Sequence, residues 1–234
     1  MLPTDLPLLR SCGRPSLLPD GRAAVVAVSA PDLDSDRSQG RLWWVPLDGD
    51  GPPRPLTHGH DDSSPVCSPD GRWVAFCRSV DGAPSQPYLM PLDGGEPWRV
   101  ASAPSAVTAP RFSPDGTGLA YLARDPQDGR YVADAAAEAP RLISTLQYRN
   151  DNLGYFRDRP RRLWVVELPD DGVEASARPV TDVDLEVGAF EWWPDSRHLV
   201  AVAARHAAQE LDLRRDAVLV DRTGSVPVPL TDAD

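Results

Sequence analysis

A four-residue turn recurs along this chain, and its recurrence constrains the fold more than any other feature of the sequence. It reads Ser-Pro-Asp-Gly at 68–71 and 113–116, Leu-Pro-Asp-Gly at 18–21, and Trp-Pro-Asp-Ser at 193–196. Pro fixes φ at the second position and Gly accepts a positive φ at the fourth, which suits a type I turn with a following bulge. We predict structural roles in these turns for Asp20, Gly21, Asp70, Gly71, Asp115, Gly116 and Asp195.

A short apolar run follows each turn. The runs cover residues 24–28, 72–77, 119–123 and 198–203 and are rich in β-branched, aromatic and small residues. Their apolar side chains fall on both faces, so we expect strands that are covered on both sides. A strand–turn–strand pattern trails each run, at 42–57, 88–100, 163–181 and 217–231. Each copy therefore predicts a four-stranded antiparallel unit.

The spacing of the turns predicts a β-propeller. Asp20 and Asp70 are 50 residues apart and Asp70 and Asp115 are 45 apart, as expected for four-stranded blades. The next interval, 80 residues to Asp195, is too long for one blade, and we assign the excess to an insertion of about 35 residues. We predict an all-β partial propeller of about four blades, at about 11–58, 62–102, 106–182 and 187–234, with an insertion at about 125–161.

The insertion has two halves of different character. The Ala-rich stretch 131–146 favours a short helix, which Pro140 would interrupt or start. The stretch 147–162 is a polar loop with five arginines and three aromatic residues. A net charge of −11 repels phosphate backbones, so we expect no nucleic-acid partner. Long inserted loops are usually functional or disordered, and this one is a candidate for docking within the protein or on a partner.

The stretch from Pro140 to Tyr155, PRLISTLQYRNDNLGY, precedes an apolar strand at 162–168. Together with the Ser-Pro-Asp-Gly turns and the Leu-Asp-Gly-Gly turn at 92–95, it resembles the N-terminal propeller of prolyl oligopeptidase family serine peptidases. Within that family the chain most resembles the acylaminoacyl-peptidase and dipeptidyl-peptidase-like branch. The resemblance extends from about residue 11 to 231. TolB-like propellers share the turn motif and give the main alternative, a scaffold for protein partners, as WD-type propellers also are.

The resemblance implies that substrate selection and catalysis reside in two different domains. In such peptidases the propeller screens peptide substrates by size, and a C-terminal α/β-hydrolase domain of the same polypeptide carries the Ser-Asp-His triad. The resemblance makes Tyr148, Arg149, Asp151 and Tyr155 candidates for a substrate gate or an interdomain interface. The nucleophile elbow Gly-x-Ser-x-Gly is absent from all 234 residues, so we assign no catalytic residue and expect this chain alone to be inactive.

Other motifs indicate neither a cofactor nor a metal. His58, His60 and Asp61 have metal-ligating side chains, but they fall on a predicted inter-blade connection, where a solvated loop is the better interpretation. The three cysteines suggest no disulfide framework and favour a reducing compartment. The first residues have neither a basic n-region nor a long apolar stretch, so we expect no signal peptide. No run of about 18 apolar residues occurs in the sequence, and we expect a cytoplasmic protein without a membrane partner.

The number of predicted blades is low. About four blades are near the minimum for closure, whereas the family resemblance implies seven or eight. Because the chain stops where the fourth predicted blade stops, we expect it to be the first part of a larger polypeptide. The alternative is an independent half-propeller that assembles with a second copy, as a homo-oligomer, or with a partner.

Overall fold

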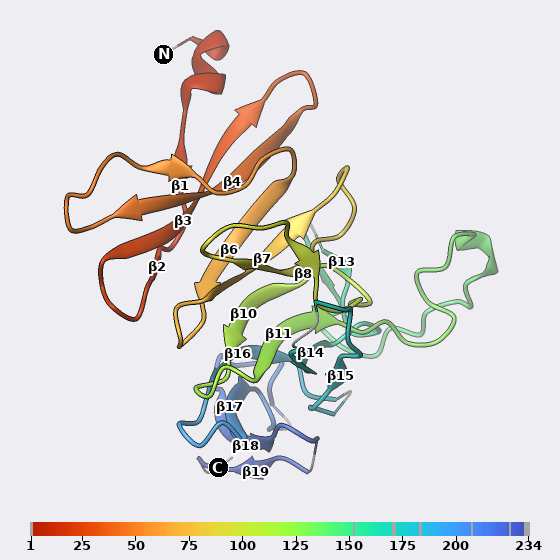
Figure 1. Ribbon diagram of the computed structural model, residues 1–234. Coiled ribbons are helices and arrows are strands. Elements are labelled where there is room, and N and C mark those ends of the chain that lie inside the picture. The colour runs from red at the N-terminus through yellow and green to blue at the C-terminus, as the bar shows by residue number, and fades with distance from the viewer. Residues whose placement is uncertain are drawn as a thin grey trace. The chain divides into compact units, whose positions relative to one another are not determined.

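A computed structural model describes residues 2–151, 153–169, 172–182, 184–206, 208–224 and 226–231. The chain forms two compact units, Met1–Tyr121 with Val166–Ala177, and Leu122–Val165 with Arg178–Asp234. Strands dominate both units, as Figure 1 shows. Residues 232–234 of the predicted fourth blade and Asn152 of the family-like stretch lie outside the described residues.

The first sheet follows a short N-terminal 3-10 helix, η1 (Pro3–Leu8). Its strands are β1 (Ser11–Cys12), β2 (Ser16–Leu17), β3 (Ala23–Asp32), β4 (Arg37–Pro46) and β5 (Arg54–Pro55). The order is β1-β3-β4-β5, and β2 also pairs with β3. The second sheet has the order β6-β7-β8-β9, with β6 (Asp61–Cys67), β7 (Trp73–Ser79), β8 (Gln86–Pro91) and β9 (Trp98–Arg99).

Two further sheets follow the same plan. The third has the order β10-β11-β14-β15, with β10 (Thr108–Phe112), β11 (Gly118–Arg124), β14 (Arg161–Glu167) and β15 (Arg178–Pro179). The fourth has the order β16-β17-β18-β19, with β16 (Val187–Trp192), β17 (His198–Ala203), β18 (Asp216–Asp221) and β19 (Val228–Pro229). Between β11 and β14 lie the 3-10 turn η2 (Ala135–Ala137) and the hairpin of β12 (Arg149–Asn150) and β13 (Gly154–Tyr155).

The recurring turns join β2 to β3, β6 to β7, β10 to β11 and β16 to β17, and side-chain hydrogen bonds stabilise them. In the second sheet, the Ser68 hydroxyl donates to Asp70 Oδ1 (2.5 Å), which also accepts the Arg72 N–H (3.0 Å), and Gly71 has a φ of +71°. Ser113, Asp115 and Gly116 repeat this arrangement, Gly116 having a φ of +74°. In the degraded turn Ser196 itself adopts a φ of +59°. Asp20 and Asp195 likewise accept the N–H two residues later, at 3.0 and 2.9 Å.

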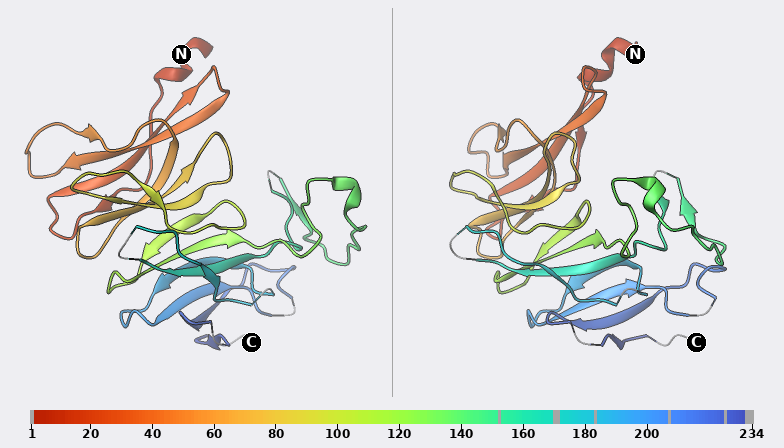
Figure 2. Two further views of the ribbon diagram at one scale, coloured as in Figure 1. Left: turned by 45° about the vertical axis from the view of Figure 1, so that its right-hand side comes forward. Right: turned by 90° about the vertical axis from the view of Figure 1, so that its right-hand side faces the viewer.

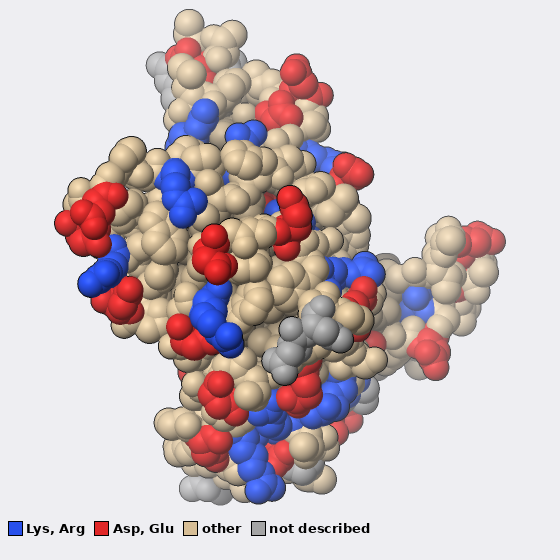
Figure 3. All heavy atoms as spheres, viewed as in Figure 1, with Lys and Arg blue, Asp and Glu red and all other residues tan. Residues whose placement is uncertain are grey.

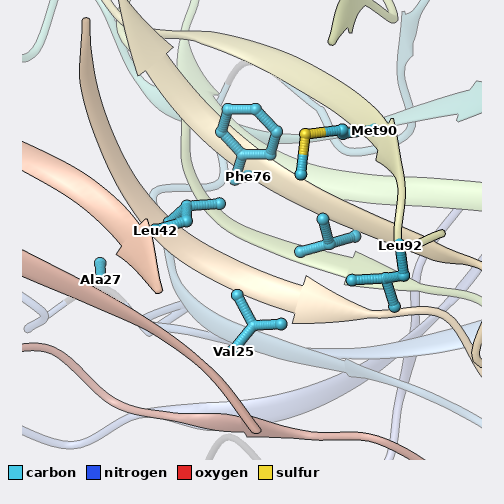
Figure 4. Packing of buried hydrophobic residues seen from close by; sticks show 7 residues of the cluster. Val25, Ala27, Leu42, Phe76, Met90 and Leu92 are labelled. Carbon is cyan, nitrogen blue, oxygen red and sulfur yellow. The ribbon is translucent and has the colours of Figure 1, made fainter. Parts of the chain in front are cut away.

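One cluster of buried apolar residues in the first unit contains side chains of its first two sheets. Figure 4 shows Val25, Ala27 and Leu42 of the first sheet near Phe76 and Met90 of the second sheet. Leu92, which directly follows β8, belongs to the same cluster. Beside this cluster, the Arg78 guanidinium makes two hydrogen bonds to the Asp62 carboxylate (2.7 and 2.9 Å). Both side chains are buried, and the charges neutralise each other where water cannot solvate them.

The predicted strands are confirmed, but their coverage differs among the sheets. Strands β7 and β11 are buried on both faces, as expected. Strand β17 alternates instead, with Leu199, Ala201 and Ala203 buried and Val200 and Val202 only half-buried. The expectation of two covered faces is therefore wrong for this strand. Apolar residues occupy both of its faces, so the sequence does not indicate which face is covered by a neighbouring sheet.

The predicted helix in the insertion is also wrong. Within residues 131–146 the structure contains only the three-residue η2 turn, capped by the Asp134 carboxylate, which accepts the Ala136 N–H (3.0 Å). None of the η2 residues is buried. Pro140 removes a backbone donor, and the alanines have no apolar surface to pack on, so a longer helix gains nothing.

The cysteines are free thiols: Cys12 is exposed, Cys67 half-buried and Cys77 buried. Burial raises the pKa of the Cys77 thiol to about 12. In the part of the chain that the structure describes, no helix is long and apolar enough to cross a membrane.

Candidate functional site: the insertion at residues 125–161

The candidate site is the insertion, residues 125–161, which follows β11 and ends at the start of β14. It belongs to the second compact unit. Its two ends run side by side, because the Asp125 N–H donates to the Pro160 carbonyl (3.1 Å) and the Gln127 N–H to the Asp158 carbonyl (2.8 Å). Figure 2 shows η2 and the β12–β13 hairpin on this excursion, coloured green to teal. The insertion is thus a folded segment with a narrow base.

Arginines fix the base of the insertion. Arg124, at the end of β11, forms an ion pair with Glu186 (2.7 Å) and donates to the Arg159 carbonyl (2.9 Å). Arg162, in β14, forms an ion pair with Asp125 (2.7 Å). These pairs are partly buried and charge-assisted, so they hold both ends of the insertion more firmly than exposed ion pairs would.

Arg161 adds a third anchor at the base. Its backbone N–H donates to Glu186 Oε2 (2.7 Å), and its guanidinium donates to the Val187 carbonyl (2.7 Å). Burial lowers the pKa of this guanidinium, although the nearby Glu186 charge opposes the shift. The anchor connects the returning chain to the start of β16.

The body of the insertion is organised around the Asp158 carboxylate. Arg141 Nε donates to Asp158 Oδ2 (2.7 Å), and the Tyr131 hydroxyl lies 2.7 Å from Asp158 Oδ1. Arg141 also bonds Glu138 through Nη2 (2.7 Å). Burial alone would raise the pKa of Asp158, but the hydrogen bonds from Tyr131 and Arg141 and the Arg141 charge lower it below its ordinary value of 3.8.

Aromatic rings contact Arg141 and Arg159 of the insertion. The Arg141 guanidinium carbon lies 4.5 Å from the ring centre of Tyr155 and 5.4 Å from that of Tyr131. Arg159 lies 4.3 Å from the Tyr131 ring centre. The sequence contains no lysine, so all 24 basic residues are arginines, whose planar guanidinium groups can stack on rings and bond carboxylates at the same time.

A cavity of about 200 Å³ opens beside this network. The Tyr148 and Tyr155 rings, on the β12–β13 hairpin, have centres 6.2 Å apart and both line it. Its walls also include Arg141, Leu142, Ile143 and Arg157. The cavity therefore offers aromatic and aliphatic surface with arginine donors, a combination suited to a side chain or a short peptide segment.

The structure brings together two of the four predicted gate residues. Tyr148, 39% exposed, and Tyr155, half-buried, line the cavity. Arg149 and Asp151 lie on the same hairpin, where Arg149 pairs with Tyr155 across the strands, but both side chains are exposed and neither lines the cavity. The hairpin turns through Gly154, which has a φ of +76°.

Sequence reasoning missed the residues that build the network. The sequence pattern assigns Tyr131 to the expected helix and indicates no role for Glu138, Arg141 or Glu210. Their partners lie from 3 to 64 positions away in the sequence, so no local motif joins them. The excess of arginines and tyrosines in the insertion was the only available signal.

The charges in the cavity wall are paired, which limits its chemistry. Arg141 is neutralised by Asp158 and Glu138, and Arg157 by Glu210 (3.0 Å). The site can therefore select by shape and hydrogen bonding rather than as an open anion site. Within the described residues, no group of three or more His, Cys, Asp or Glu side chains could hold a metal ion.

On the face seen in Figure 3, arginines and acidic side chains are interspersed. This mixture accompanies a net charge of −11. It provides no extended basic surface on that face for a polyanionic partner.

One five-stranded sheet, in which β2 is an addition to the predicted four strands, and three four-stranded sheets define the fold class as an all-β, partial β-propeller. A Pyrococcus horikoshii acylaminoacyl peptidase structure superposes on 97% of this chain with a TM-score of 0.70 and 16% identity, using 33% of the peptidase chain. A Mycobacterium tuberculosis puromycin-hydrolyzing peptidase matches 97% of this chain and 39% of its own, with a TM-score of 0.57 and 15% identity. The predicted resemblance to peptidase propellers is confirmed at the level of the fold.

A putative TolB from Agrobacterium tumefaciens also has this fold: it matches 95% of this chain and 81% of its own, with a TM-score of 0.56 and 17% identity. The chain spans about a third of the length of the acylaminoacyl peptidase chains that it matches. No family model and no curated protein sequence matches it.

Proposed function

We propose that this chain is the substrate-gating propeller portion of a serine peptidase that acts on short or N-acylated peptides. The observation that carries the proposal is the superposition of 97% of the chain on an acylaminoacyl peptidase, at a TM-score of 0.70. Fold alone does not determine function, so the proposal depends equally on a site that can select substrates. The insertion is that site.

The insertion has the properties of a selective gate. Its cavity of about 200 Å³ accommodates a side chain or a short peptide segment, but not a long polypeptide, folded or unfolded. Tyr148 and Tyr155 provide the contact surface in this proposal, and Arg149 and Asp151, exposed on the same hairpin, face a neighbouring domain. A loop that limits access to an active site can determine which substrates are hydrolysed without taking part in the chemistry.

The hydrolytic chemistry belongs to a partner in this proposal. The sequence contains no nucleophile elbow, so the serine, histidine and aspartate of a triad would come from a C-terminal α/β-hydrolase domain of the same polypeptide. The proposal also includes the division of the chain into four blades, a cytoplasmic location and assembly into a homo-oligomer.

The test compares size selectivity with and without the gate. The chain is produced together with the hydrolase domain encoded in its reading frame, and hydrolysis of an N-acylated chromogenic dipeptide is compared with hydrolysis of an unfolded protein substrate. We expect the wild type to cleave only the short substrate, and a variant lacking residues 126–160 to cleave both. A paired Tyr148→Ala and Tyr155→Ala variant should relax selectivity, whereas Trp193→Ala, at an exposed aromatic side chain outside the insertion, is the matched control.

Three results would contradict the proposal. They are turnover by this chain alone, a reading frame without a hydrolase domain, and unchanged size selectivity after deletion of the insertion. The first would require a nucleophile elsewhere in these residues, and the second would remove the partner.

A protein-interaction scaffold of the TolB type is the second candidate. The observation in its favour is coverage, because this chain corresponds to 81% of the Agrobacterium protein but to only a third of the peptidase. In that case the insertion should be dispensable for folding and irrelevant to hydrolysis. Unchanged selectivity after its deletion, together with stable capture of a protein partner by the isolated chain, would favour the scaffold.

A further inference from the structure

We infer that Glu210, on the connection between β17 and β18, is a positioning residue that holds the insertion in its folded arrangement. This inference rests on the proposed function of the insertion, because it explains how a gate without an apolar core keeps its shape. Glu210 lies 49 residues beyond the end of the insertion in the sequence, and no motif marks it.

One glutamate contacts the insertion at three points. The Leu146 N–H donates to Glu210 Oε2 (3.0 Å), and Arg157 Nη2 donates to Glu210 Oε1 (3.0 Å). The Gln147 side-chain amide donates to the Glu210 backbone carbonyl (3.0 Å). Both carboxylate oxygens are therefore used, and each holds a different stretch of the insertion.

The contacts form a closed unit rather than isolated surface bonds. Arg157 Nε also donates to the Gln147 carbonyl (2.9 Å), so the two stretches held by Glu210 are bonded to each other as well. The Glu210 and Arg157 side chains are only 22% and 33% exposed, which shields their ion pair from solvent. Because Arg157 lines the cavity, Glu210 sets the position of one cavity wall.

Apolar contacts cannot replace this unit. Leu146 is 73% exposed and Leu142 94% exposed, and Leu211, next to Glu210, is 75% exposed. A segment with few buried apolar contacts opens locally at low free-energy cost. The polar contacts of Glu210 therefore restrain the two ends of the stretch from Leu146 to Arg157. The Asp158 network and the hydrogen bonds from Arg159 to the Leu153 and Tyr155 carbonyls hold its middle part.

Amide hydrogen exchange on the full chain tests the inference directly, because the Leu146 N–H itself donates a hydrogen bond to the Glu210 carboxylate. We expect Glu210→Ala to accelerate exchange at Leu146 by about tenfold, since a hydrogen bond to a charged group is lost. Glu210→Gln should give an intermediate rate, because its amide oxygen can still accept one bond. Glu174→Ala, which removes an exposed ion pair with Arg99 in the other unit, is the matched control and should change nothing at Leu146.

Arg157→Gln provides a second route to the same result. It removes one side of the unit without altering the β17–β18 connection, and it should also accelerate exchange at Leu146. Wild-type exchange rates at Leu146 in both Glu210→Ala and Arg157→Gln would overturn the inference. The inference would also be overturned by a combination of two results: loss of amide protection throughout the chain in Glu210→Ala, and wild-type protection of the Leu146 amide in Arg157→Gln.

A second measurement separates this inference from the proposed function. In the protein produced with its hydrolase domain, Glu210→Ala should permit hydrolysis of the unfolded protein substrate, which the wild type excludes. Faster exchange with unchanged selectivity would leave Glu210 as the positioning residue and contradict the gate. Unchanged exchange would contradict the role of Glu210 whatever the selectivity shows.

Discussion

The second sheet and the insertion are held together by different forces. In β7, Val74, Ala75 and Phe76 are fully buried, and each removes apolar surface from water. Among the described residues of the insertion only Pro160 is buried, and the segment is instead bonded through arginines, tyrosines and carboxylates. A sheet held by apolar burial can lose a surface group without consequence, whereas the insertion depends on a few specific pairs.

This difference predicts different sensitivities. Apolar burial is almost independent of pH and weakly affected by moderate salt, whereas partly exposed ion pairs weaken as salt screens them or as carboxylates take up protons. The framework should therefore persist under conditions that loosen the insertion. An insertion of this kind can open without unfolding of the sheets.

The largest effect should come from the apolar core. Phe76→Ala removes a fully buried ring that packs against Tyr88, with ring centres 6.1 Å apart, and should lower the free energy of unfolding by about 3–5 kcal/mol. Leu142→Ala, at a side chain that is 94% exposed, should change it by less than about 0.5 kcal/mol. Urea denaturation measures both, and equal effects would remove the contrast between the two regions.

A smaller effect is expected at the turn that begins β7. Gly71 has a φ of +71°, and a Cβ there would meet only Pro19 at an ordinary distance of 3.5 Å, so the cost of a side chain comes from the backbone. Gly71→Val should destabilise the chain by about 1–2 kcal/mol. The neighbouring Arg72→Val has no positive φ to satisfy and should cost less than about 1 kcal/mol. An unchanged denaturation midpoint in Gly71→Val would contradict the role of this turn.

The sheets could be predicted from sequence because their determinants are local. Residues 68–71 contain the whole turn, from the Ser68 hydroxyl to the positive φ of Gly71, and the apolar run of β7 follows at once. The same signal located β11 and β17. The position of the insertion followed from the interval between two turns, which is also a local observation.

The architecture of the insertion could not be predicted in this way. Its alanines have helical propensity, yet Pro140 and the lack of an apolar surface leave only η2. Tyr148 and Tyr155 were found through a resemblance, whereas Arg141, Asp158 and Glu210 act through pairs that folding creates. Composition can indicate that arginines will find carboxylates, but not which ones.

The smallest predicted effect sharpens the comparison through pH. The folded-state pKa of Asp158 is lowered below 3.8, so its stabilising contribution is fully present above the unfolded pKa and is lost as pH falls through the folded pKa. Below about pH 4 the contacts of Asp158 with Arg141 and Tyr131 should weaken, and exchange at insertion amides should accelerate while β7 stays protected. Asp158→Asn cannot ionise and should show the loosened state with little dependence on pH in this range. If the polar network of the insertion weakens independently, the apolar sheets stay folded on acidification. Simultaneous loss of amide protection in β7 and in the insertion would therefore show that the two regions are not held by separate forces.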